Sequence, residues 1–204
     1  MKPSYKLIVF GAALVCLVAI GTGALSAQGP HKKAASPVLL TSCGQSPGPE
    51  RVLFFLKRLK MDHEFLAQAK AGDLVGRQKA GKPYKTVIIV TGASLKGMGA
   101  AGVSMTDELT RTAALIAEAK RQGLTIIGAH VEGMARRAQG AAPGDNSDEQ
   151  SIDAVMPLAH LMIVRQDGNE DKRFTVISSS KKIPLILFEK NMELGDILTR
   201  VFGG

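Results

Sequence analysis

Short, continuous aliphatic runs alternate with helical patterns along this chain. Six segments are predicted strands, and four of them are runs of apolar residues without regular polar interruption. Such runs are typical of parallel strands that are buried on both faces of a sheet. The predicted strands are residues 38–41, 63–66, 86–90, 125–130, 161–164 and 185–188.

Helical periodicity fills the segments between these runs. Apolar stripes predict helices over residues 52–59 and 194–202, and shorter helices over 149–160 and 171–181. A further helix is expected to start near Met105, because Ser104 and Asp107 resemble a capping box. The stripe predicted to face the core of that helix is Met105, Leu109, Ala113, Ile116 and Ala117.

Repeated strand–helix units predict an α/β fold, a three-layer sandwich with a mostly parallel, Rossmann-like or flavodoxin-like sheet. Pro184 places the last strand at an edge of that sheet, or marks where the strand begins. Residues 37–204 are expected to form one domain after a flexible tether over 28–36.

Residues 1–27 have the pattern of a signal peptide. Lys2 and Lys6 precede a long apolar run, and small residues follow at Ala24, Ser26 and Ala27. The pattern predicts a periplasmic or secreted protein that is not inserted in the membrane after cleavage. The alternative is a protein anchored by an uncleaved N-terminal helix, because the run is close to the length that spans a bilayer.

Composition argues against several classes of function. The formal charge of +8 is dispersed, and the chain has no Trp and only two Tyr, so neither nucleic-acid binding nor aromatic stacking is expected. The four His are scattered without ligand spacing, and Cys43 is the only Cys outside the leader, so no metal site is predicted. The oligomeric state stays open.

A glycine-rich segment follows the third predicted strand. Strand, glycine loop and helix bring backbone N–H groups against anionic ligands in many α/β proteins. The spacing Gly97, Gly99, Gly102 matches a dinucleotide motif, but residues 92–96 separate it from the strand. A nucleotide is therefore not favoured, and the cofactor stays unknown. The segment is interpreted either as a cradle for an anion, with Ser94 and Lys96 as donors, or as a turn that permits close packing.

The first predicted strand runs into a second polar segment. Cys43 is expected just ahead of a helix that opens at Pro47 and Gly48, where a thiolate is electrostatically favoured. It is interpreted either as a nucleophile or redox centre, or as a small buried residue. The neighbouring candidates for ligand contact are Ser42, Gln45 and Ser46.

Loops that follow parallel strands share the carboxyl edge of the sheet, where open α/β sheets bind ligands. The later loops of this edge add a candidate base, His130, and candidate ligand contacts. Those contacts are Glu132, Arg136, Arg137 and Asn169. Paired arginines suit a carboxylate or phosphate through bidentate hydrogen bonds.

Five stretches resemble an uncharacterised family of exported bacterial α/β proteins, the domain-of-unknown-function 6305 family. They are residues 37–48, residues 94–102 with the helix that follows, 135–137, 168–169 and 193–195. The resemblance implies export and a Rossmann-like sandwich, and it implies no reaction.

Three functions follow from these patterns. The first is an exported domain that binds a small polar or anionic molecule at the carboxyl edge. The second is an envelope enzyme that uses Cys43 as nucleophile or redox centre with His130 as base. The third is a protein-interaction module. Whether the protein is an enzyme is left open by the sequence.

Overall fold

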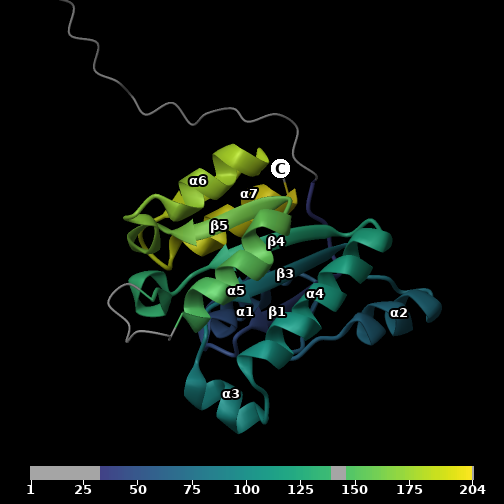
Figure 1. Cartoon of the computed structure of the whole chain (residues 1–204). Helices are drawn as coiled ribbons and strands as arrows, with labels where there is room; N and C mark the ends of the chain where they lie inside the picture. The colour runs from purple at the N-terminus through teal and green to yellow at the C-terminus, as the bar shows by residue number, and fades with distance from the viewer. Residues whose placement is uncertain (1–32, 139–145, 204) are drawn as a thin grey trace, which may run out of the picture.

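The computed structural model describes residues 33–138 and 146–203. Six parallel strands form one sheet in the order β2-β1-β3-β4-β5-β6 (Figure 1). The predicted signal peptide lies outside the described residues, as do residues 28–32 of the predicted tether. Within the described ranges, no helix is both long enough and apolar enough to cross a membrane.

The strands are β1 (Val38–Cys43), β2 (His63–Phe65), β3 (Thr86–Thr91), β4 (Thr125–His130), β5 (Leu161–Arg165) and β6 (Leu185–Phe188). The α-helices are α1 (Gly48–Arg58), α2 (Ala71–Lys79), α3 (Leu95–Ala101), α4 (Met105–Arg121), α5 (Ser147–Val155), α6 (Arg173–Lys181) and α7 (Glu193–Gly203). Short 3-10 helices are η1 (Gly133–Arg136), η2 (Met156–Leu158) and η3 (Gln166–Asn169).

All six predicted strands are confirmed, with ends that differ by at most two residues. Because β1 lies between β2 and β3, the chain reverses its direction of winding at β1 and β3, as in flavodoxin-like sheets. The strand that follows Pro184 is at the sheet edge, as predicted. The α/β sandwich expected from the sequence is therefore the observed fold.

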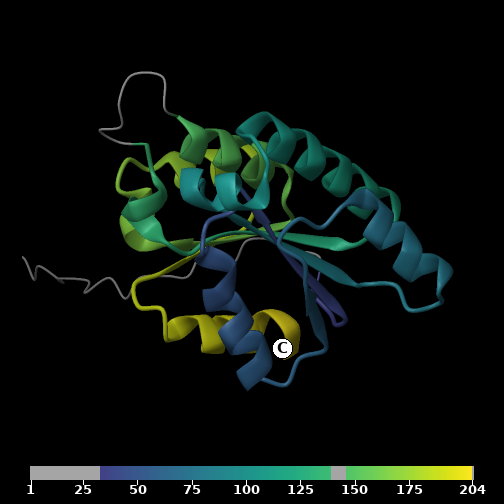
Figure 2. The same ribbon diagram turned by 90° about the horizontal axis from the view of Figure 1, so that it is seen from below.

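Two helical layers cover the sheet. In Figure 2, α1 and α7 lie on one side of the strands and the remaining long helices lie on the other. Alternate strand residues divide between the two cores: Leu39 and Val87 face the layer of α2, α4, α5 and α6, whereas Leu40 and Ile88 face α1 and α7. Both faces are apolar, which explains the continuous aliphatic runs.

Two helices differ from the sequence prediction. Residues of α2 were not predicted as a helix. The glycine-rich segment was expected to be a loop, but most of it forms α3, which starts after the N-cap Ser94 and ends at Gly102. Gly102 has φ of +67°, the left-handed conformation that ends many helices at glycine.

The buried stripe of α4 also differs from the predicted one. The helix starts at Met105 behind the predicted Ser104–Asp107 capping box. Its buried residues, however, are Glu108, Thr112, Leu115, Ile116 and Ala119, whereas Ala113 and Ala117 are exposed. The buried face of α4 is therefore rotated from the face that its apolar residues predict, because the first turns of the helix bury polar groups against the end of β1.

Glu108 and Arg111 form the buried ion pair that explains this rotation. Glu108 Oε1 accepts a hydrogen bond from Arg111 Nε at 2.8 Å, and the two side chains are only 1% and 9% exposed. Burial alone would raise the pKa of Glu108. The hydrogen bonds from Arg111, the Gly44 N–H and Gln45, with the charge of Arg111, hold that pKa below its ordinary value.

We expect Glu108→Leu to lower the free energy of unfolding by about 3–5 kcal/mol, because the substitution leaves the Arg111 guanidinium buried without a counter-charge. Arg111→Met removes the other partner. The double variant should lose less stability than the sum of the two single losses, because it leaves no uncompensated charge. Urea unfolding of the four proteins measures this coupling. Additive losses would show that the pair does not act as a unit.

Candidate functional site

The turn after β1 is fixed by the buried ion pair on α4. Glu108 Oε2 accepts hydrogen bonds from the Gly44 N–H and from Gln45 Nε2, both at 2.9 Å. Arg111 donates to the carbonyl oxygens of Ser42 at 2.6 Å and Ala69 at 2.7 Å. The turn therefore has a defined shape in which Gly44 and Gln45 both have positive φ.

This turn is joined to the turn after β3. The Ser94 N–H donates to the Gly44 carbonyl oxygen at 2.7 Å, and Gln45 and Ala93 form an antiparallel bridge. A Cβ atom at Gly44 would lie only 2.6 Å from the Gly92 carbonyl oxygen. Open α/β sheets have their ligand crevice where the winding reverses, which here is between β1 and β3. In this chain that crevice is closed by the protein's own backbone.

The N-terminus of α1 is occupied by a carboxylate of the same chain. Glu132, which is 4% exposed, accepts a hydrogen bond from the Gly48 N–H through Oε2 at 3.1 Å. Its Oε1 accepts from Arg136 Nε at 3.4 Å. The predicted contact residue Glu132 therefore holds a position at which a ligand anion would compete with it.

The thiol of Cys43 is buried in the core beneath α4. The residue is 0% exposed, and it belongs to the core cluster on the side opposite α1. Burial raises the pKa of Cys43 to about 11. Because β1 continues through Cys43, the side chain follows the alternation of the strand and faces away from the helix whose N-terminus was expected to activate it. The geometry favours the structural interpretation over a nucleophile.

His130 is also buried among the protein's own groups. Its Nε2 lies 3.0 Å from the Gly133 carbonyl oxygen, and its Nδ1 lies 3.1 Å from the hydroxyl of Thr91. A neutral ring that donates from Nε2 and accepts at Nδ1 satisfies both contacts. Burial lowers the pKa of His130 to about 4. The ring is thus held neutral and away from solvent, which does not suit a general base.

Arg137 supports the loop beyond β4 instead of facing solvent. Its side chain is 1% exposed and donates to Glu149 at 2.7 Å, to Asp171 at 2.6 Å and to the Gly168 carbonyl oxygen. Asn169 is 2% exposed, and its side-chain oxygen accepts from the Phe174 N–H at 3.0 Å. Both predicted contact residues therefore shape the walls of the carboxyl edge.

Three predicted ligand-contact residues do come together at one cavity. We call it the Lys96 cavity, and its volume is about 440 Å³. It lies where the turn after β3 meets η1 and the first turn of α5. Its lining consists of Ala93, Ser94, Leu95, Lys96, Arg136, Ser147 and Asp148.

Hydrogen-bond donors converge on the Lys96 cavity. Arg136 uses Nη1 to donate to the Ala93 carbonyl oxygen at 2.9 Å, while its Nη2 donates to no residue within 33–138 or 146–203. The Lys96 side chain is exposed and likewise has no partner among those residues. The Ser94 hydroxyl accepts from the Gly97 N–H at 3.0 Å, which leaves its own proton to donate. A small group with acceptor oxygens would satisfy these donors.

The other predicted contact residues lie away from this lining. Ser42 and Ser46 are buried, and their hydroxyl oxygens accept from the Gln45 and Gly48 N–H groups. Gln45 bonds Glu108 and the Ala67 carbonyl oxygen. Gly97, Gly99 and Gly102 belong to α3 and its cap.

Sequence reasoning missed the contribution of α5 to this cavity. Asp148 Oδ1 accepts from the Ala93 N–H at 2.6 Å, and Ser147 completes the wall. A polar first turn after a long polar loop was the available signal. In the part of the chain that the structure describes, no three His, Cys, Asp or Glu side chains are placed to hold a metal ion.

The strand order and the two helical layers define an open α/β protein of flavodoxin-like topology with a polar cavity at its carboxyl edge. A family model described as Domain of unknown function (DUF6305) matches residues 35–202. The chain therefore belongs to this family, as the sequence motifs predicted. A search of curated proteins found no match.

Solved structures show only distant likeness. The psychrotrophic esterase EstA from Pseudoalteromonas sp. is 11% identical over 81% of this chain and 96% of that one, with a TM-score of 0.33. The SGNH-hydrolase family esterase AlinE4 is 10% identical over 77% of both chains, with a TM-score of 0.31. A sugar-phosphate isomerase assigned as putative, from Listeria monocytogenes, is 15% identical over 78% of this chain and 74% of that one, with a TM-score of 0.28. These TM-scores carry no argument about activity.

Two glycines of α3 form a matched test of packing. A Cβ atom at Gly97 would overlap the Gln45 carbonyl oxygen, whereas a Cβ atom at Gly99 would meet nothing within 4 Å. We expect Gly97→Ala to destabilise the fold by about 1–3 kcal/mol, because backbone must shift. Gly99→Ala should stabilise it by up to about 1 kcal/mol through helix propensity. Thermal unfolding of both variants measures the difference, and equal effects would contradict a packing role for Gly97.

The buried neutral His130 predicts loss of stability in acid. Its pKa is about 4 in the folded protein and about 6.5 when unfolded, so the unfolded chain binds more protons between these values. The free energy of unfolding should therefore fall by up to about 3 kcal/mol as the pH drops from 6.5 to 4. His130→Gln should lack most of this slope. Urea unfolding at several pH values measures it, and parallel curves for the two proteins would refute the assignment.

Proposed function

We propose that this protein is an exported binding domain that holds a small molecule with a carboxylate or phosphate group in the Lys96 cavity. The observation that carries the proposal is the convergence of Lys96, Arg136 and Ser94 on one cavity of about 440 Å³. The charged residues of its lining are Lys96, Arg136 and Asp148. Arg136 is paired with Glu132, whereas Lys96 forms no ion pair with any residue in 33–138 or 146–203, so Lys96 is the cation that attracts a negatively charged group.

The geometry around Arg136 supports this ligand class. The guanidinium is anchored on one side by Glu132 and by the Ala93 carbonyl oxygen, so it is oriented before a ligand arrives. A pre-oriented donor loses less conformational entropy on binding than a freely moving side chain does. Asp148 accepts from the Ala93 N–H, which ties the first turn of α5 to the turn after β3.

The proposal also includes cleavage of the predicted signal peptide and residence in the cell envelope. An enzyme based on Cys43 receives less support, because that thiol is buried with a pKa of about 11 and His130 is buried as a neutral ring. Ligand binding needs neither residue.

Native mass spectrometry of the protein purified from its own host's envelope tests the proposal, because it reports the N-terminal cut and any bound mass together. We expect a polypeptide cut after residue 24, 26 or 27 that carries a small mass lost on denaturation. Lys96→Ala should raise the Kd about tenfold, which corresponds to a loss of roughly 1.4 kcal/mol, and should therefore lower the fraction of protein that carries the mass.

Lys120→Ala is the matched control, because Lys120 is an exposed lysine in the last turn of α4, next to the amino edge of the sheet. It should retain the bound mass. A bare polypeptide from the unsubstituted protein, or the same loss in both lysine variants, would contradict specific binding in the Lys96 cavity.

A further inference from the structure

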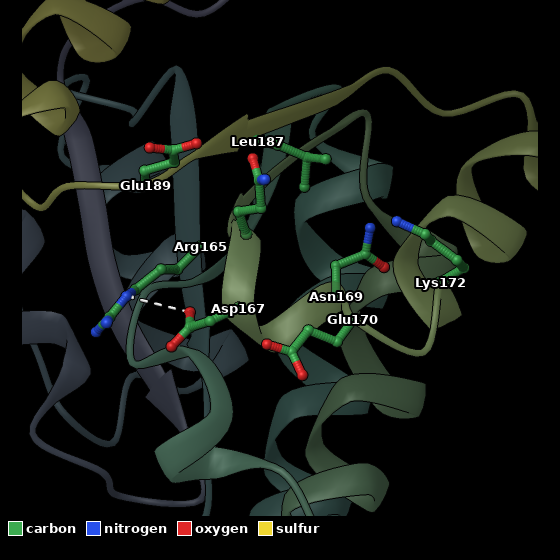
Figure 3. A pocket seen from close by; sticks show the side chains of 8 residues that line it. Arg165, Asp167, Asn169, Glu170, Lys172, Leu187 and Glu189 are labelled. Carbon is green, nitrogen blue, oxygen red and sulfur yellow. Dashed lines mark ion pairs between the residues drawn. The ribbon is translucent and has the colours of Figure 1, made fainter.

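A second cavity lies at the carboxyl ends of β5 and β6. We call it the Glu170 cavity (Figure 3); its volume is about 410 Å³, and it shares no lining residue with the Lys96 cavity. The sheet register pairs Arg165 with Phe188, so the segments that follow the two strands meet there. The lining residues that matter for binding are Arg165, Asp167, Glu170, Lys172, Leu187 and Glu189.

One charged pair forms the fixed wall of this cavity. Arg165 Nε lies 3.1 Å from Asp167 Oδ1, as the dashed line in Figure 3 marks. The same carboxylate accepts from the Gly168 N–H at 3.0 Å and from the Met134 N–H at 3.4 Å. Asp167 therefore ties η3 to η1, and its charge is already compensated by Arg165.

Two further carboxylates line the cavity and do not tie elements of the fold together. Glu170 follows η3 and Glu189 follows β6. Figure 3 shows Glu189 above the Arg165–Asp167 pair and Glu170 to the right of it. Both are exposed, and neither forms an ion pair with any residue that the structure describes. Both carboxylates line the same cavity, so a cationic ligand there would be attracted by each of them.

The charge of this lining opposes that of the whole chain. Three carboxylates face two cations in the cavity, whereas the full sequence has a formal charge of +8. After the Arg165–Asp167 pair is set aside, two carboxylates and the Lys172 ammonium remain. Leu187, which is 40% exposed, adds an apolar surface beside them.

We propose that the Glu170 cavity binds a small molecule that carries ammonium or guanidinium groups. Glu170 and Glu189 hold its positive charge, and its aliphatic part lies on Leu187. The Lys172 ammonium repels the cation and so lowers its affinity. The inference does not rest on the function proposed for the Lys96 cavity, because the residues differ and the preferred charge is opposite.

The test compares two probes of equal length and opposite charge, 1,5-diaminopentane and glutarate, at constant ionic strength. Backbone amide resonances of residues 165–172 and 187–189 are followed in the isotope-labelled full chain. We expect the diamine to shift these resonances to saturation, and glutarate to leave them unchanged.

Four variants show whether the effect is specific to the charges of this cavity. Glu189→Gln should weaken the diamine about two- to fivefold, and Lys172→Gln should tighten it by a similar factor, as expected for exposed charges. Asp62→Asn removes an exposed carboxylate just before β2, at the other edge of the sheet, and should change nothing. Lys96→Ala should also leave the diamine affinity unchanged, which separates this result from the proposed function.

The proposal is overturned if the diamine gives no saturable shift, or if glutarate shifts the same resonances equally. Equal weakening by Asp62→Asn and Glu189→Gln would also overturn it, because the effect would then be one of net charge alone.

Discussion

The carboxylate of Glu108 fixes the turn after β1, and the carboxyl edge of the sheet depends on that turn. One side chain of α4 binds the Gly44 N–H, Gln45 and Arg111, and Arg111 in turn binds two carbonyl oxygens. Buried charges are tolerated when hydrogen bonds satisfy them on every side, as here. Because the turn after β3 bonds to the turn after β1, the ion pair also positions Ser94 and the start of α3.

The same network moves the candidate binding site away from the point where the winding reverses. Ligands of open α/β proteins usually lie in the crevice at that point. Here the Gln45–Ala93 bridge closes the crevice between β1 and β3, and Glu132 occupies the N-terminus of α1. Donors that still face solvent are found one step further out, on Lys96 and Arg136. The polar network at the strand ends therefore supports the edge of the sheet, and the candidate site lies at the rim of that network.

Much of the fold was predictable, because strands that are buried on both faces of a sheet are continuous aliphatic runs, as β1, β3, β4 and β5 are. Pro184 predicted either an edge strand or the start of a strand, and β6 is at the edge and begins at Leu185. The buried face of α4 was not predictable from apolar residues alone, because it includes the polar residues Glu108 and Thr112. Two of the partners of Glu108 lie in the turn after β1, far away in sequence. At the candidate site, Ser94, Lys96 and Arg136 were predicted from residue type and loop position. The burial of Arg137 depends on Glu149 and Asp171, 12 and 34 residues further on, which local sequence does not encode. The partners of Asn169 are local, because its side chain accepts from N–H groups in the first turn of α6, five and six residues away.

Gly97 shows how a ligand-binding motif can arise from packing. Its spacing with Gly99 and Gly102 matches a dinucleotide motif, in which glycine permits a close approach of backbone to pyrophosphate. In this chain the group that approaches Gly97 is the carbonyl oxygen of Gln45, and Gly102 ends the helix in the left-handed conformation. A Cβ atom at Gly99 or at Gly102 would meet nothing within 4 Å, so Gly97 is the one glycine of the three that close packing requires. The absence of a side chain therefore serves the contact between α3 and the turn after β1. The role of each glycine in such a motif is shown by the group that contacts it, and the spacing of the glycines alone does not show it.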